Sequence, residues 1–457
     1  MLDHIFRAYD IRGRVGTEIN FSFARALGRA CGEYFLAKGR PRAVLGRDCR
    51  LSSPELAAEV AQGLMQTGVD VISLGMVPTP VFYFAAAYLE VDAGVMVTAS
   101  HNPPEYNGFK IYCQGATLHT GQIQEIAELM ANAREDTVAP LSGVLGEHDI
   151  VPTYLEDMAG RAALHGPIKV VVDGGNGAGG LICVDLLRKL GAEVVAINCE
   201  PDGTFPNHHP DPVVEENMGE LKARVVAEKA DLGIGLDGDA DRIAAFDEKG
   251  EMLYGDRLLA IYARDLLKEH PGAMVIGEVK CSHLLYRDIQ AHGGEPLMWQ
   301  AGHSMIKAKM RETGALLGGE VSGHVFFADR YLGFDDAAYG AARLLEIMTK
   351  NPTTPLSAML EDWPQTFVTP EIRVFCPEEK KFLVTEKAKE TFSYQYETID
   401  VDGVRVLFND GWALVRASNT QPALVMRFEA ETRDRLEAIR EMIEEPVTQW
   451  IGELSSS

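Results

Sequence analysis

The chain has 457 residues, of which 46% are hydrophobic and 24% charged, and its formal net charge is −24. This length allows several hydrophobic cores, and we expect three or four domains. The acidic excess repels nucleic acids and anionic membranes, and no apolar stretch is long enough to span a bilayer, so we expect neither partner. An anionic ligand must therefore be bound by a few well-placed Arg and Lys side chains.

The start of the chain and its cysteines indicate a cellular compartment. Residues 1–4 lack the basic and then apolar order of a signal peptide. The seven cysteines are odd in number, scattered, and contain no Cys-x-x-Cys pair. This pattern is typical of reduced, buried thiols rather than of a disulfide framework or a zinc site. The sequence therefore predicts a cytoplasmic protein.

One arrangement of strands and helices occurs three times, over residues 42–100, 168–242 and 272–324. Each copy has a short apolar strand, a helix, a Gly-rich turn, a second strand, a second helix and a third strand. Such alternation indicates parallel sheets covered on both faces, and ligands bind beyond the carboxyl ends of strands in such sheets. We therefore expect three similar mixed or parallel α/β domains, followed by a smaller α+β domain, around a central cleft. The predicted domains are 1–150, 151–250, 251–365 and 366–457.

In the first copy, the third strand runs into TASHNPPEYNGFK, residues 98–110. The apolar run turns polar at Ser100, two prolines restrict the backbone after it, and Lys110 adds a cation. Ser100 could simply cap a turn. A Ser-His-Asp hydrolase is disfavoured, because no Gly-x-Ser-x-Gly elbow is present and His101 adjoins Ser100, a poor geometry for a base. We interpret His101 as structural.

The second copy begins with VVVDGGNGAGG, which contains Gly175-x-Gly177-x-x-Gly180 between a strand and a helix. With Glu200 near the end of the next strand, this resembles a dinucleotide fingerprint. However, the strand ends in an aspartate before the glycines, and Glu200 runs straight into another turn, PDGTFP. We therefore favour a tight strand-to-helix turn.

The same copy ends in an acidic loop in which Asp237, Asp239 and Asp241 alternate. Alternation turns three carboxylates toward one point, which suits a hard divalent cation. A calcium EF-hand would need Gly at its sixth position, where Arg242 stands, and helices on both sides, where we predict a strand and a hairpin. A solvated acidic loop is the third interpretation, but clustered carboxylates between apolar strands are costly without a cation. We favour Mg²⁺, which could also ligate a phosphate carried on Ser100.

The third copy ends in GGEVSGH, residues 318–324. Glu320 and Ser322 lie among glycines and are suited to hydrogen bonds with the vicinal hydroxyls of a sugar. His324, and His303 in AGHS, are candidates for acid/base work or substrate contact, although a lone histidine is usually a satisfied polar group.

The C-terminal part reads as a hairpin over 403–418, a strand over 422–431 and a closing helix, which predicts the smaller α+β domain. The hairpin ends in VRASNTQP, residues 415–422. One guanidinium with several hydroxyl or amide donors is what a non-transferring phosphate needs, and a surface turn is the alternative. The candidates are Arg416, Ser418, Asn419 and Thr420.

Seven motifs occur in one order along almost the whole chain: FRAYDIRG (6–13), TASHNPPEYNGFK, GLDGDADR, EVKCS (278–282), AGHS, GGEVSGH and RASNTQP. In these motifs the chain resembles the α-D-phosphohexomutase superfamily, close to its bacterial phosphomannomutase/phosphoglucomutase branch. The resemblance implies that Ser100 carries a phosphoryl group and that Asp237, Asp239 and Asp241 bind Mg²⁺ together with a phosphoserine oxygen. It implies that Arg12, Lys110 and Arg242 support the transferring phosphate and the acid/base step, with His324 as general base. The substrate site would comprise Tyr9, Lys280, His303, Glu320, Ser322, Arg416, Ser418, Asn419 and Thr420.

The implied reaction interconverts hexose 1-phosphates and hexose 6-phosphates through a 1,6-bisphosphate that reorients in the site, with glucose or mannose 1,6-bisphosphate as activator. Phosphoglucosamine mutases usually have Gln where Val321 stands, and FRAYDIRG differs from their N-terminal motif, so we expect mannose and glucose phosphates. The alternatives are a phosphoglucosamine mutase, a metal-dependent sugar-phosphate phosphatase and a non-enzymatic sensor. We expect small hexose phosphates as partners of a monomer or weak homo-oligomer.

Overall fold

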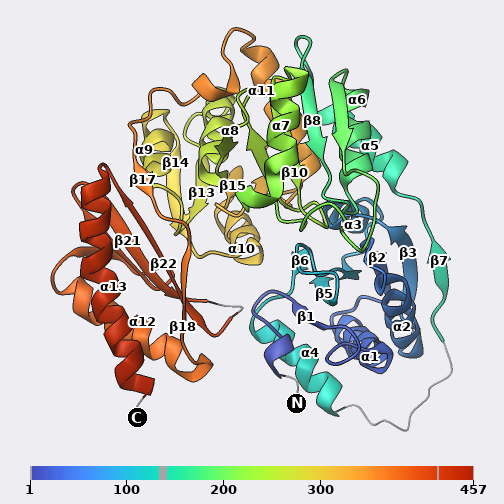
Figure 1. Ribbon diagram of the computed structural model, residues 1–457. Helices are drawn as coiled ribbons and strands as arrows, with labels where there is room; N and C mark the ends of the chain where they lie inside the picture. Colours follow the sequence, from blue (N-terminus) through green and yellow to red (C-terminus); the bar gives the residue numbers. More distant parts are fainter. Residues whose placement is uncertain (1–2, 133–141, 419–420, 456–457) are drawn as a thin grey trace.

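The computed structural model describes residues 3–132, 142–418 and 421–455, and over these residues it contains four sheets with their helices. Figure 1 shows that the four units follow one another in an arc, with the N-terminal unit in blue and the C-terminal unit in red at its two ends. No helix within the described ranges is long and apolar enough to cross a membrane.

The first unit has a sheet in the order β1-β5-β4-β2-β3-β7, with β6 paired to β5. Its strands are β1 (Ile11–Arg14), β2 (Arg42–Arg47), β3 (Asp70–Met76), β4 (Ala93–Val97), β5 (Tyr106–Cys113), β6 (Ala116–Thr117) and β7 (Leu145–Glu147). Its helices are η1 (Asp3–Ile5), α1 (Phe21–Ala37), α2 (Ser53–Gln66), α3 (Thr79–Tyr88) and α4 (Gly121–Asn132), and α5 (Val151–Arg161) leads into the second unit.

The second and third units repeat this plan with shorter sheets. The second sheet has the order β12-β11-β10-β8-β9 and the third β14-β13-β15-β16. The second unit contains β8 (Lys169–Asp173), α6 (Gly180–Lys189), β9 (Glu193–Ile197), η2 (Glu215–Met218), α7 (Gly219–Glu228), β10 (Leu232–Leu236), β11 (Ile243–Phe246) and β12 (Met252–Leu253). The third contains α8 (Gly255–Glu269), β13 (Met274–Glu278), α9 (His283–Ala291), β14 (Glu295–Trp299), α10 (His303–Thr313), β15 (Leu317–Gly319), β16 (Val325–Phe327), α11 (Ala337–Lys350) and η3 (Leu356–Ala358).

The C-terminal unit is a fully antiparallel sheet covered by two helices. It contains β17 (Phe367–Val368), β18 (Ile372–Phe375), α12 (Glu378–Ser393), β19 (Glu397–Ile399), β20 (Val404–Phe408), β21 (Gly411–Ala417), β22 (Ala423–Ala430) and α13 (Arg433–Ser455). The predicted hairpin is formed by β20 and β21 and the predicted closing helix by α13. Three α/β units followed by a different C-terminal unit confirm the predicted fold class.

The sheets of the first three units are mixed rather than purely parallel, because each contains an antiparallel strand beyond the three strands of the predicted repeat. The repeated strands are parallel, as in β2 with β4, β8 with β10 and β13 with β15. Each third strand is followed by an antiparallel neighbour, which is β5, β11 or β16. The connections, 98–105, 237–242 and 320–324, are too short for a crossover helix, so the chain can only turn back. All three predicted site loops are these turns.

One buried hydrophobic cluster runs through the first three units. It includes Val44 and Phe82 from the first, Val170 from the second, and Leu258 and Leu344 from the third. Because this core crosses the borders between the units, it marks no boundary, and the limits at residues 150, 250 and 365 stay predictions.

The C-terminal unit has a core of its own, which includes Val415, Phe428 and Ile439. A small separate cluster joins Val279 of the third unit to Trp412 and Leu414 of β21.

Candidate active site

Ser100 lies in the turn after β4, buried and beside the acidic loop of the second unit. Its φ of +51° places it in the left-handed region, which is costly for a residue with a side chain and is found most often where function requires it. Its hydroxyl donates a hydrogen bond of 2.7 Å to Oδ2 of Asp237. The turns that end two successive repeats therefore place their chemistry at one point.

His101 lies closer to Ser100 than its position in the sequence led us to expect. Its Nδ1 is 3.1 Å from the Ser100 hydroxyl oxygen, because the left-handed turn folds the neighbouring ring back toward the serine. Burial, with Arg242 and Arg12 nearby, lowers the pKa of His101 well below its usual value, so the ring is neutral near pH 7.

The acidic loop brings one oxygen from each of Asp237, Asp239 and Asp241 within 4.8 Å of the others, and all three side chains are buried. Asp237 also organises the turn, since its Oδ1 accepts hydrogen bonds from the backbone N–H groups of Asp241 (3.1 Å) and Arg242 (3.2 Å). Burial and the neighbouring carboxylates raise the pKa of Asp237 well above its usual value. The predicted convergence of three carboxylates is present, between a strand and an antiparallel return rather than between helices.

Lys110, on β5, pairs with two of these carboxylates. Its ammonium lies 2.7 Å from Oδ2 of Asp239 and also contacts Oδ2 of Asp241. Although burial lowers the pKa of Lys110, the two carboxylates outweigh it and raise that pKa well above its usual value. Oδ1 of Asp239 stays buried without a hydrogen bond, and Oδ1 of Asp241 has a 3.3 Å ion-pair contact with His324. Hard oxygen donors that are not fully paired in a buried cluster fit a divalent cation.

The glycine-rich turn after β8 supports the acidic loop from behind. A Cβ on Gly177 would lie 2.6 Å from the carbonyl oxygen of Gly238, and one on Gly179 would lie 2.2 Å from the Cβ of Ala240. The backbone N–H of Ala178 donates to Gly238 O at 3.0 Å. These glycines are therefore explained by close packing of two loops, which supports the tight-turn interpretation.

His324 lies between two carboxylates. Its Nε2 is 3.3 Å from Oδ1 of Asp241, and its Nδ1 is 2.9 Å from Oε2 of Glu320. Burial and the Arg242 charge lower its pKa, but the two carboxylates dominate and raise the pKa of His324 to about 9. The same contact lowers the pKa of Glu320 to about 2 against the effect of burial. At neutral pH this imidazole carries a proton.

The sugar-binding candidates surround this histidine. The Ser322 hydroxyl is 3.0 Å from Nδ1 of His324, and Glu320 accepts a hydrogen bond of 2.6 Å from the backbone N–H of Gly302. The rings of His303 and His324 stack with centroids 5.4 Å apart. The loops GGEVSGH and AGHS thus form one wall of the site.

Asp335, Lys307 and Thr79 complete the site and were missed in the sequence. Asp335 pairs with Nδ1 of His303 at 3.2 Å and with the Lys307 ammonium at 2.9 Å. The Thr79 hydroxyl donates to Oδ2 of Asp239 at 2.5 Å. The acid pair in LGFDDAA, directly before α11, was the available signal for Asp335; Thr79 gives no comparable signal.

The N-terminal motif reaches the site from the far edge of the first sheet. Arg12 donates to Oδ1 of Asn102 at 2.7 Å and to the carbonyl of Ala99 at 3.3 Å, so it supports the Ser100 turn. The Tyr9 hydroxyl donates to the carbonyl of Ala301 at 2.7 Å, in the AGHS loop.

The C-terminal phosphate-binding candidates are only partly placed beside this centre. Nε of Arg416 pairs with Oδ2 of Asp402 at 2.9 Å, and the same oxygen accepts from the backbone N–H of Ala301 at 3.1 Å. The Ser418 hydroxyl accepts from the backbone N–H of Gln421 at 3.1 Å. Asn419 and Thr420 lie outside the described residues. Lys280 pairs with Glu371 at 2.7 Å, at the junction with the C-terminal unit.

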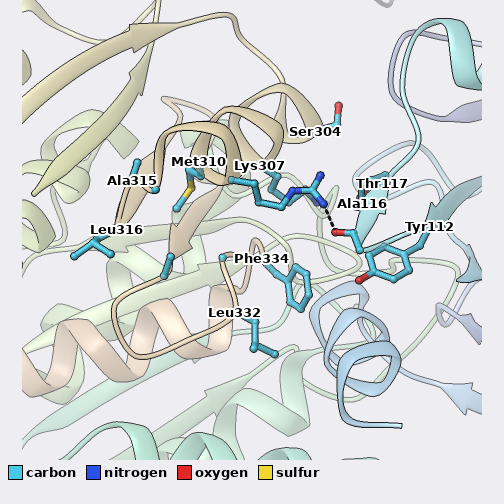
Figure 2. Close-up of a pocket in the computed structure, with 15 residues that line it drawn as sticks. Tyr112, Ala116, Thr117, Ser304, Lys307, Met310, Ala315, Leu316, Leu332 and Phe334 are labelled. Carbon is cyan, nitrogen blue, oxygen red and sulfur yellow. Dashed lines mark hydrogen bonds between the residues drawn. The ribbon is translucent and has the colours of Figure 1, made fainter. Parts of the chain in front are cut away.

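A separate pocket of about 280 Å³ lies where the first and third units meet. Figure 2 shows that Tyr112 and Thr117 line one side and Lys307 and Met310 the other. Arg311 bridges the two sides with a hydrogen bond of 2.6 Å to the carbonyl of Gly115. Neither Ser100 nor the acidic loop lines this pocket.

Comparison with known proteins matches the chain in four consecutive parts. The families described as phosphoglucomutase/phosphomannomutase alpha/beta/alpha domains I, II and III match residues 3–137, 152–250 and 254–367, and the C-terminal domain of the same description matches residues 371–445.

Individual relatives match over almost the whole length. A phosphomannomutase/phosphoglucomutase of Pseudomonas aeruginosa is 48% identical over 437 residues, covering 95% of this chain and 94% of its own. The crystal structure of a phosphoglucomutase/phosphomannomutase family protein from Burkholderia thailandensis is 42% identical, with a TM-score of 0.91 and 98% of both chains covered.

A more distant structure shares the fold alone. It is Aspergillus fumigatus N-acetylphosphoglucosamine mutase in complex with GlcNAc-6P and magnesium, 17% identical, with a TM-score of 0.57, and it covers 78% of this chain and 89% of its own. With the family descriptions and near-full-length relatives in agreement, the chain belongs to the phosphoglucomutase/phosphomannomutase family of α-D-phosphohexomutases.

Proposed function

We propose that the chain interconverts the 1-phosphates and 6-phosphates of mannose and glucose through a phosphoserine at Ser100 and a hexose 1,6-bisphosphate. Interconversion of hexose 1- and 6-phosphates is the activity of its family. The route rests on one observation above all, the 2.7 Å hydrogen bond between the Ser100 hydroxyl and Asp237 inside a buried carboxylate cluster. A phosphoryl group on that oxygen would lie against the cluster.

Mg²⁺ is the cofactor we propose for this cluster. Asp237, Asp239 and Asp241 would hold it together with an oxygen of the phosphoserine, since they offer hard oxygen donors and Oδ1 of Asp239 is buried without a hydrogen bond. When bound, the ion supplies neutralisation of the negative charge on the transferring phosphoryl group. Lys110 already neutralises part of the cluster, which keeps the free site from accumulating uncompensated charge.

In the first half of the reaction the free hydroxyl of a hexose 1-phosphate attacks the phosphorus on Ser100. The P–O bond to Ser100 Oγ breaks, a P–O bond to the sugar forms, and the hydroxyl proton passes to the neutral ring of His324. Ser100 Oγ is left as the anion that accepts a phosphoryl group in the second half. Arg12 contacts the Ser100 turn, Lys110 pairs with the acidic loop, and the Arg242 charge acts on His101 and Asp237. These cations would favour the charge that spreads over the phosphoryl oxygens.

In the second half the 1,6-bisphosphate turns end for end, and Ser100 Oγ takes the other phosphoryl group. His324 then returns a proton to the sugar oxygen, so one histidine serves as base and acid in a reversible cycle. With a pKa of about 9, His324 is protonated at neutral pH and can donate a proton to the sugar oxygen. To accept the hydroxyl proton in the first half, the ring must be neutral.

The remaining candidates hold the sugar and its second phosphate. Glu320 and Ser322, on either side of Val321, would bind the ring hydroxyls, with His303 and Lys280 near them. Arg416 and Ser418, with Tyr9 close by and Asn419 and Thr420 next in sequence, would hold the non-reacting phosphate. Glucose or mannose 1,6-bisphosphate would act as activator by phosphorylating Ser100.

Phosphorus NMR tests the route. The protein is given Mg²⁺, a trace of glucose 1,6-bisphosphate and, in separate tubes, mannose 1-phosphate, glucose 1-phosphate or glucosamine 1-phosphate. We expect 6-phosphates from the first two sugars and no turnover by Ser100→Ala. Release of inorganic phosphate alone would indicate a phosphatase, and conversion of glucosamine 1-phosphate alone a phosphoglucosamine mutase.

A further inference from the structure

Arg50 is a fully buried arginine whose side chain contacts the Ser100 turn only through backbone carbonyl groups. Nη2 donates to the carbonyl oxygens of Ser100 at 2.7 Å and Asn102 at 2.5 Å. Nη1 donates to those of Pro103 at 2.7 Å and Tyr106 at 3.0 Å. One guanidinium thus collects four carbonyl groups along the turn, from the proposed phosphoserine to the start of β5.

Asp48 holds the guanidinium in place. Its Oδ2 accepts from Nε of Arg50 at 3.1 Å, while its Oδ1 accepts from the backbone N–H of Arg50 at 3.0 Å and from the Ser53 hydroxyl at 2.5 Å. Ser53 is the first residue of α2, and it also accepts a hydrogen bond of 2.9 Å from Asn107. The arginine is therefore fixed to the rigid sheet and helix of the first unit, not to the turn it supports.

The second unit closes over the other side of the same arginine. The Phe205 ring lies with its centroid 5.0 Å from Cζ of Arg50, a cation–π contact. A Cβ on Gly203 would lie 2.5 Å from the carbonyl oxygen of Cys49, so PDGTFP packs directly on the Asp48–Arg50 segment. This gives that turn a role beyond ending a strand.

Arginine is suited to this task for a geometric reason. Ser100 has a left-handed backbone, and such a conformation costs about 1–3 kcal/mol unless its surroundings hold it. The five N–H groups of a guanidinium form a rigid fork that can hold several carbonyl groups at fixed angles, whereas a lysine ammonium is a single point charge. Among the described residues, no other side chain donates four hydrogen bonds to the backbone carbonyl groups of this turn.

We propose that Arg50 is a positioning residue for phosphoryl transfer, which acts through the backbone of the Ser100 turn and fixes where the serine oxygen meets Asp237. It contacts Ser100 only through the backbone carbonyl oxygen, and its hydrogen bonds reach neither the carboxylates of the acidic loop nor a predicted substrate-binding side chain. The proposal rests on the proposed route through Ser100, and it adds a residue that the sequence motifs leave out. A displacement of about 1 Å at a reacting atom costs on the order of 10²-fold in rate, so loss of the fork should appear in turnover rather than in binding.

The test compares Arg50→Lys with Arg343→Lys in the full chain. Arg343 is equally buried but pairs with Asp329 at 2.9 Å in the third unit, away from the Ser100 turn. We expect Arg50→Lys to lower kcat for glucose 1-phosphate about 100-fold with KM within about twofold, and to slow phosphorylation of Ser100 by glucose 1,6-bisphosphate, followed by intact mass. Arg343→Lys should lower the melting temperature about as much as Arg50→Lys does, but its kcat should stay within about threefold of the wild-type value.

A milder variant covers the case in which Arg50→Lys does not fold. Asp48→Asn keeps an oxygen acceptor but removes the charge that orients the fork, and we expect a kcat loss of roughly tenfold without a change in KM. Wild-type kcat in either folded variant, or a loss confined to KM, would overturn the role of Arg50. If Ser100→Ala keeps wild-type activity, the route itself fails and the role of Arg50 fails with it, so the two failures are distinguishable.

Discussion

The first three units and the C-terminal unit are attached in different ways. One hydrophobic cluster spans the first three units, in addition to smaller clusters within each, and their turns contact one another directly through Ser100, Asp237 and His324. The C-terminal unit has its own core and meets the third unit through one small apolar cluster and a set of polar contacts. The charged residues of the reaction centre thus lie in the closely packed first three units. The loop proposed to bind the non-reacting phosphate lies in the C-terminal unit.

The polar contacts between the third and C-terminal units centre on the EVKCS segment. Arg405 donates to the carbonyl oxygens of Val279 and Cys281, each at 2.7 Å, and its guanidinium lies 3.7 Å from the centroid of the Trp412 ring. Such contacts fix the C-terminal unit by hydrogen bonds that water can replace, unlike the apolar core of the first three units. Changes in the reaction centre should therefore affect turnover, and changes in the C-terminal unit should affect substrate binding.

The largest effect is expected in the reaction centre, from Lys110→Met. Loss of the ammonium leaves Asp239 and Asp241 without their cation and removes a charge beside the phosphoryl group. We expect kcat to fall about 10²- to 10³-fold. Without Mg²⁺ the buried like charges should also lower the melting temperature, and Mg²⁺ should raise it by more than in the wild type.

Lys222→Met is the matched control for this variant. Lys222 lies on α7 and pairs with Glu215 at 2.5 Å in a partly exposed position. Its loss should leave kcat and the Mg²⁺-induced shift in melting temperature unchanged. A Lys110→Met protein with no larger response to Mg²⁺ than the wild type would contradict the proposal that Lys110 neutralises the carboxylates of the free site.

Sequence reasoning succeeded where a local pattern determines the geometry. The alternation of Asp237, Asp239 and Asp241 after an apolar strand was enough to predict convergent carboxylates, and the strand-end rule placed Ser100 at the same edge. It failed for contacts between residues that lie far apart in the sequence of one unit. No spacing connects Arg50 with the Ser100 turn, and the acid pair in LGFDDAA does not indicate that Asp335 pairs with His303.

The second prediction concerns the C-terminal unit. Arg416→Gln removes the guanidinium proposed to bind the non-reacting phosphate, and charged hydrogen bonds of this kind contribute about 1.5–3 kcal/mol. We expect KM for glucose 1-phosphate to rise roughly 10- to 100-fold while kcat stays within about threefold, in steady-state kinetics. Arg440→Gln, on the partly exposed face of α13, should change neither. If kcat of Arg416→Gln fell by as large a factor as KM rose, the C-terminal unit would affect turnover as well as substrate binding, contrary to this prediction.

The smallest effect on turnover is expected at Glu429, which joins the two regions. This buried carboxylate accepts hydrogen bonds from the hydroxyls of Ser282 (2.7 Å) and Thr366 (2.8 Å). Burial alone would raise the pKa of Glu429, but His283 and the two hydroxyls outweigh it and lower that pKa to about 2. The unfolded value is about 4.3, so its contribution to stability is complete above that pH and is lost as the pH falls from about 4.3 toward 2.

Glu429→Gln should therefore destabilise the protein by roughly 1–3 kcal/mol at pH 7, by less near pH 3.5, and should change kcat less than twofold. The amide retains an oxygen for the two hydroxyls, which both donate to Oε1, but its NH₂ group opposes the indole N–H of Trp412, which donates to Oε2 at 2.5 Å. Urea unfolding at the two pH values measures the difference. In Glu437→Gln, at an exposed position of α13, the small stability change should be the same at both. A pH-independent loss in Glu429→Gln would mean that packing, rather than the charge of Glu429, holds the C-terminal unit to the third.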